Sequence, residues 1–174
     1  MNTLEAIAKR KSTRAYTDRQ IPEEVLDAIL KAGCAAPVAM ARYDSLHITV
    51  VQTKELIVRV NAATEETLLK LIGQRRSMDF GAKTLLLISS MPQHRPGMEY
   101  CNVGIVVENM VLAATDLGVD SVILGAAPAA IAEDEELLKE LGIPEGLRPI
   151  LGIFLGYGAE EQPPKSHSIC INRV

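Results

Sequence analysis

Five consecutive residues near the amino terminus carry the densest set of groups suited to a phosphate: Arg10, Lys11, Ser12, Thr13 and Arg14. An arginine presents a planar fork of N–H donors that matches phosphate oxygens, and a serine adds a compact hydroxyl at short range. The segment lies in a polar stretch between two predicted helices. Taken alone, it fits a solvated basic loop somewhat better than a phosphate site.

The other reactive side chains form no recognisable site. Cys34, Cys101 and Cys170 are far apart, and we interpret them as buried reduced thiols rather than as a disulfide framework. The three histidines show no metal-ligand spacing, so no metal site is predicted. The sequence contains no nucleotide phosphate loop, dinucleotide fingerprint or serine-hydrolase elbow. Either the protein is not an enzyme, or a cofactor supplies its reactivity.

Composition limits the classes of partner. The chain has 174 residues, which suits one domain, and its formal net charge is −4 with no tryptophan. Binding to nucleic acid is therefore disfavoured. No apolar run is long enough to span a membrane, and Glu5 stands where a signal peptide needs an apolar core. We therefore expect a cytoplasmic protein with no membrane partner.

Hydrophobic periodicity and turn residues predict alternating helices and strands. One helix, 100–117, is apolar on all sides, which predicts burial inside a layer or at a subunit interface. A second helix begins at Pro22 with Gly33 as its C-terminal cap. Further helices are predicted near the amino terminus after Asn2, over 54–72 in two pieces and over 134–141, with strands over 47–52, 84–90, 120–124 and 147–155.

The tail at about 159–174 carries two prolines and then alternates at Ile169 and Ile171. This pattern suggests a last strand or an arm that docks on a neighbouring subunit. The elements together predict a single α+β or mixed α/β domain that covers 1–174.

Several short motifs occur in an order that resembles the nitroreductase family, and they cover nearly the whole chain. They are RKSTRAY at 10–16, IPEEVL at 21–26, AGCAAP at 32–37, FGA at 80–82, ENMVLAA at 108–114, LGVDS at 117–121 and LGIFLGY at 151–157. The resemblance implies an α+β fold with a central, mainly antiparallel sheet packed between helices. It also implies a homodimer with FMN at the subunit interface and a domain-swapped C-terminal arm.

The resemblance further implies an FMN-dependent oxidoreductase with ping-pong turnover. NADH or NADPH would reduce the flavin, which would then reduce a nitroaromatic, a quinone or a similar small acceptor. The flavin performs the hydride chemistry, so no side chain is assigned as catalytic.

The basic segment would bind the cofactor. Arg10 and Ser12 match the family positions that hold the phosphate and ribityl end of FMN, and Lys11 lies in the same segment. Arg14 would lie near the pyrimidine edge, where a cation stabilises the negative charge of reduced flavin.

Two further segments would complete the cofactor site. Leu124, Gly125 and Ala126 match the loop near the reactive nitrogen, where a glycine lets backbone approach the ring closely. Lys165 and His167 fall where the family places a basic pair on the phosphate, although Lys165 fits a solvated tail lysine equally well.

The segment that begins with Pro37, Val38, Ala39 and Met40 departs from the family pattern. There the family usually has Ser-x-x-Asn-x-Gln-Pro-Trp, and neither Val38 nor Ala41 can replace those side-chain hydrogen bonds. Each neutral bond is worth about 1 kcal/mol, against roughly 1.5–3 kcal/mol for a charged phosphate contact. We therefore expect FMN binding to survive, with substrate preference and redox potential altered.

Two alternatives to the reductase remain. The altered segment 38–45 would also suit a non-catalytic dimer that binds or handles flavin. A structural or interaction protein of similar fold without a cofactor is the third possibility.

Overall fold

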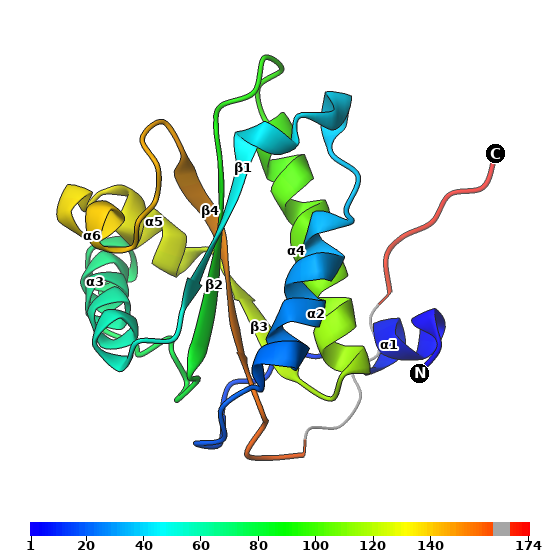
Figure 1. Cartoon of the computed structure of the whole chain (residues 1–174), viewed down its shortest axis with the longest axis horizontal. Coiled ribbons are helices and arrows are strands. Elements are labelled where there is room, and N and C mark those ends of the chain that lie inside the picture. The colour runs from blue at the N-terminus through cyan, green and yellow to red at the C-terminus, as the bar shows by residue number, and fades with distance from the viewer. Residues whose placement is uncertain (162–167) are drawn as a thin grey trace.

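The structure, a computed structural model, describes residues 1–161 and 168–174. Within these ranges a four-stranded sheet lies between two groups of helices (Figure 1). The strands are β1 (Leu46–Val51), β2 (Thr84–Ser90), β3 (Asp120–Leu124) and β4 (Arg148–Gly156). The helices are α1 (Thr3–Lys9), α2 (Glu23–Cys34), α3 (Lys54–Ile72), α4 (Met98–Asp116), α5 (Ala126–Ala132) and α6 (Glu135–Glu140).

The sheet is antiparallel throughout, in the order β1-β2-β4-β3. β2 is buried along its whole length, as its uninterrupted apolar run predicts for a strand covered on both faces. Its register with β4 shifts between Ile88 and Ser89, beside the pairing of Ser89 with Pro149. A proline has no N–H for the ladder, so it is tolerated at such an irregularity.

Helices cover both faces of the sheet. α2 and α4 pack over one face around a core that includes Ile29, Ile88 and Met110. α3, α5 and α6 lie on the other face, over a second core that includes Leu87 and Phe154 (Figure 1). These two layers of helix on an antiparallel sheet confirm the predicted α+β class.

Helix α3 is one continuous helix, so the prediction of two pieces over 54–72 was wrong. No glycine or proline interrupts the segment, and the Thr64 hydroxyl donates to the Val60 carbonyl within the same helix at 2.7 Å. The helix ends at Gly73, whose φ of 71° is the left-handed conformation of a C-terminal cap.

Gly33 does not cap α2, as the sequence pattern had predicted, but lies within its last turn. Its backbone packs directly on α4, where an added Cβ would lie 2.7 Å from Cγ of Met110. The missing side chain therefore serves the close approach of two helices and not a left-handed turn.

Burial around α4 also differs from the prediction. One side of this helix is buried, but Tyr100, Cys101 and Ile105 are exposed in the single chain. Burial of this helix on all sides inside a layer of the single chain was therefore wrong, and its burial at a subunit interface stays a prediction.

The cysteine prediction was half right. The three cysteines are free thiols, as expected, but all three are exposed rather than buried. Their spacing in the sequence gave no information on whether each side chain would be buried.

Two other elements differ from the sequence patterns. Helix α5, which contains Pro128, was missed because its run of small residues shows no amphipathic stripe. Residues 168–174 form no strand and lie on the α1 side of the molecule (Figure 1), and the side chains of Ile169 and Ile171 are exposed. In the described ranges, no helix combines the length and apolarity that a bilayer crossing requires.

Substitution of Gly33 by alanine tests the contact between α2 and α4. The new methyl group must displace Met110, which is fully buried, so the free energy of unfolding should fall by about 1–3 kcal/mol in urea denaturation. In a Met110→Ala background the same change should cost less, because the obstructing side chain is gone. An unchanged unfolding midpoint for the single variant would contradict this packing.

Candidate functional site

The basic segment 10–14 runs beside the edge of β3 and pairs with it through an isolated bridge. α1 ends just before it, and the Arg10 amide donates the last helical hydrogen bond to Ala6. Ser12 then forms a parallel bridge with Ser121, where the Thr13 amide donates to the Ser121 carbonyl at 2.9 Å. The segment is therefore held by the sheet and is not a free loop.

This extended geometry separates the five side chains into two faces. Successive side chains of an extended segment point to opposite sides. Thr13 is only 1% exposed, and Lys11 reaches toward Asp120, with 3.9 Å between Nζ and the carboxylate Oδ1. Arg10, Ser12 and Arg14 consequently share the other face, which we call the basic face.

Tyr16 fixes the far end of the segment. Its hydroxyl donates to the carbonyl of Phe154 at 3.3 Å. Burial raises the pKa of the Tyr16 phenol well above its usual value, and the nearby Asp120 carboxylate raises it further, against a lowering effect of Arg14. The phenol therefore stays neutral and serves as a hydrogen-bond donor throughout the physiological pH range.

The loop at the other end of β3 leaves room for a ligand beside its backbone. Leu124 ends β3, and Gly125 precedes the first residue of α5, Ala126. Gly125 is exposed, and an added Cβ there would meet no atom within 4 Å. Gly125 also lines a cavity of about 480 Å³ that includes Glu99 and Arg148. The backbone at Gly125 is thus open to close approach.

The segment 37–40, unlike the other two segments, does not lie at β3. It packs against the first turns of α4. The amide of Ala39 donates to Oδ1 of Asn102 at 3.1 Å, and Asn102 is only 1% exposed. Next to this anchor, Met40 and Ala41 have φ values of 57° and 53°, in the left-handed region that side chains other than glycine rarely adopt. The strained turn leaves Met40 91% exposed.

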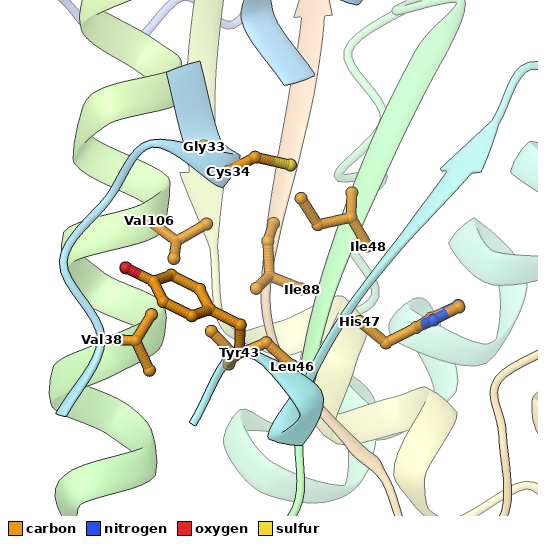
Figure 2. A pocket seen from close by; sticks show the side chains of 9 residues that line it. All are labelled: Gly33, Cys34, Val38, Tyr43, Leu46, His47, Ile48, Ile88 and Val106. Carbon is orange, nitrogen blue, oxygen red and sulfur yellow. The ribbon is translucent and has the colours of Figure 1, made fainter. Parts of the chain in front are cut away.

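An apolar cavity of about 450 Å³ opens beneath this turn (Figure 2). Val38 and Tyr43 border it, while the ring of His47 points away from the other labelled side chains. Its remaining lining is supplied by Gly33, Cys34, Leu46, Ile48, Ile88 and Val106. Such a lining suits apolar groups and offers little to a charged ligand.

The structure thus relates two of the predicted segments through one strand. Residues 10–14 lie beside the start of β3, and residues 124–126 begin at its last residue. The segment 37–40 packs against α4. Lys165 and His167 lie outside the described residues. Among residues 1–161 and 168–174, no group of three or more His, Cys, Asp or Glu side chains could hold a metal ion.

Two polar residues with clear structural roles were missed in the sequence. Asn102 is a buried amide within an otherwise apolar helix, and that contrast was the available signal. Asp120 is the first residue of the predicted strand 120–124, and its residue type gave no indication that Lys11 lies beside it.

Comparisons with known proteins agree with this architecture. The model of the nitroreductase family matches residues 7–157. A protein of Methanothermobacter thermautotrophicus, provisionally named NADH dehydrogenase/NAD(P)H nitroreductase, is 32% identical over 164 residues, which cover 92% of this chain and 79% of the relative.

Solved structures show the same fold. A nitroreductase with bound FMN from Desulfitobacterium hafniense has a TM-score of 0.86 at 28% identity, and the match covers 99% of this chain and 100% of that one. Another nitroreductase with bound FMN, from Bacteroides fragilis, has a TM-score of 0.81 at 31% identity, with coverage of 99% and 100%. The fold is therefore the nitroreductase-like α+β fold that the sequence predicted. The chain belongs to the nitroreductase family, which makes it an oxidoreductase by class.

Replacing Asn102 by leucine tests the anchor of the strained turn. The Ala39 amide would lose its acceptor, so unfolding should become easier by about 1–3 kcal/mol, and that amide should exchange its hydrogen faster. Asn109→Leu is a matched control, because the Asn109 side chain donates to Ala32 and not to the turn. Unchanged exchange at Ala39 in Asn102→Leu would show that the bond does not hold the turn.

Proposed function

We propose that the protein is an FMN-dependent oxidoreductase that takes hydride from NADH or NADPH and reduces a small acceptor by a ping-pong mechanism. A nitroaromatic or a quinone is the proposed class of acceptor. The observation that carries this proposal is the basic face, where Arg10, Ser12 and Arg14 line one side of a segment held on β3. Solved relatives of this fold contain FMN.

The donor set of the basic face fits a flavin mononucleotide. The Arg10 guanidinium and the Ser12 hydroxyl supply N–H and O–H donors for a phosphate. Arg14 is exposed and would lie toward the pyrimidine edge, where its charge would favour the reduced, anionic flavin. When bound, FMN supplies the hydride chemistry, and this chain's residues bind and orient it.

The open backbone at Gly125 supports the position of the flavin ring. No atom lies within 4 Å of where a Cβ would be, so a flat ring could rest against the main chain. Lys165 and His167 are proposed to add hydrogen-bond donors at the phosphate.

A homodimer is part of the proposal. Tyr100 and Ile105 of α4 are exposed apolar side chains, and so are Ile169 and Ile171 of the C-terminal arm. A second copy would remove this apolar surface from water. The domain-swapped position of the arm and the cytoplasmic location stay predictions.

The altered turn favours a second candidate function, a non-catalytic dimer that binds or handles flavin. Val38 is buried, and Val38 and Ala41 stand where the family usually has the side chains of Ser and Asn. The phosphate contacts would then remain while electron transfer to an acceptor is lost.

Absorption spectroscopy of the purified protein separates these functions. A yellow protein that NADH or NADPH bleaches, and that an added quinone recolours, is the expected result for the reductase. A yellow protein inert to both nicotinamides would indicate the flavin-handling dimer. A colourless protein that ignores added FMN would contradict both.

Replacement of Arg10 by alanine tests the phosphate contact. Loss of one charged contact should weaken FMN binding by about 10- to 100-fold, because such a contact is worth about 1.5–3 kcal/mol. Riboflavin, which lacks the phosphate, should bind both forms with similar affinity. Lys9→Ala is the control, since Lys9 belongs to α1 and is exposed. Equal FMN affinity in Arg10→Ala and wild type would remove Arg10 from the site.

A further inference from the structure

Asp120, the first residue of β3, connects the basic segment to the start of the C-terminal arm. Its Oδ2 atom accepts the backbone N–H of Gly158 at 3.0 Å. Its Oδ1 atom lies 3.9 Å from Nζ of Lys11. One carboxylate therefore contacts two segments that are distant in the sequence.

The Gly156-Tyr157-Gly158 motif makes this contact possible. A Cβ at Gly158 would lie 2.4 Å from Oδ2 of Asp120, and one at Gly156 would lie 2.9 Å from the ring of Tyr16. Both positions need glycine because Tyr16 and Asp120 approach the backbone so closely. The motif lacks the spacing of a dinucleotide fingerprint, and its glycines serve this packing instead.

Backbone hydrogen bonds continue the same arrangement. The Thr17 amide donates to the Tyr157 carbonyl at 2.8 Å, and the Ala159 amide donates to the Ala15 carbonyl at 2.9 Å. Residues 15–17, which follow the basic segment, thus pair with the residues that begin the arm, while the basic segment itself pairs with β3. Asp120 stands at the junction of all three.

The charge of Asp120 favours one placement of the basic segment. Attraction to its carboxylate holds Lys11 on the face of the sheet that carries the Asp120 side chain. Because side chains alternate along an extended segment, Arg10, Ser12 and Arg14 then lie on the opposite face. Asp120 itself would repel a phosphate, so a direct role as a phosphate ligand is excluded by charge.

We propose that Asp120 is a positioning residue for phosphate binding, which acts by holding Lys11 and Gly158 so that Arg10, Ser12 and Arg14 face the ligand together. The inference rests on the proposed function, because the phosphate is that of FMN. In this inference Lys11 pairs with Asp120 and does not contact the phosphate directly.

The test compares the dissociation constants of FMN and riboflavin for full-length variants, followed by flavin fluorescence. Asp120→Ala removes both contacts and should weaken FMN binding about tenfold, with riboflavin affinity within about twofold of wild type. Asp120→Asn keeps an acceptor for Gly158 and should restore part of the loss. Lys11→Met should match Asp120→Asn, and the double variant should be no weaker than either, because both remove one shared interaction.

Gly158→Ala gives an independent variant, since its methyl group would enter the space of the Asp120 carboxylate. It should also weaken FMN binding more than riboflavin binding. If Asp120→Ala does not fold, the comparison rests on Asp120→Asn, Lys11→Met and Gly158→Ala. Wild-type FMN affinity in these folded variants, or an equal loss for both flavins, would overturn the inference alone. A wild-type protein that binds neither flavin would instead overturn the proposed function.

Discussion

The hydrogen bond from the Thr13 amide to the Ser121 carbonyl holds the basic segment on β3, so that its side chains divide between the two faces of the sheet edge. In an unpaired loop of the same composition the cations would be solvated, and a change in their direction would cost little free energy. Pairing with the edge strand β3 removes that freedom and covers part of an otherwise open sheet edge. The buried Thr13 side chain makes a slip by one residue costly, because such a slip would bury Arg14 or Ser12 instead.

The fold was largely predictable because its strands carry simple patterns. The strand at 84–90 has leucine and isoleucine at 85–88 and is buried along its whole length within the sheet, and the strand at 120–124 has the predicted bounds. The predictions were wrong where one sequence pattern can have two physical causes. A glycine near a helix end serves either a left-handed cap or a close helix contact, and only the partner helix distinguishes them for Gly33. An apolar helix likewise does not reveal whether its own chain covers it.

The residue types of the candidate site suggested its chemistry only together with the family motifs, and they did not reveal its geometry. Arginine and serine at positions 10–14 suit a phosphate, but taken alone they fit a solvated basic loop somewhat better. The two faces of that segment depend on Ser121 and Asp120, which lie far along the chain. Similarly, nothing in the types of Met40 and Ala41 predicts left-handed backbone, since the strain is imposed by the surrounding structure and the Asn102 anchor.

Different interactions therefore determine the properties of the two ends of the proposed flavin site. At the phosphate end, charge and backbone pairing set affinity, and each contact is worth about 1.5–3 kcal/mol. At the turn that follows Pro37, the missing amides cost about 1 kcal/mol each, too little to decide whether the cofactor binds. The same turn carries the exposed Met40 and borders an apolar cavity, so its changes act on what approaches the site. Sequence change there can alter acceptor preference without changing the proposed phosphate contacts, because the basic segment pairs with β3 and the turn packs against α4.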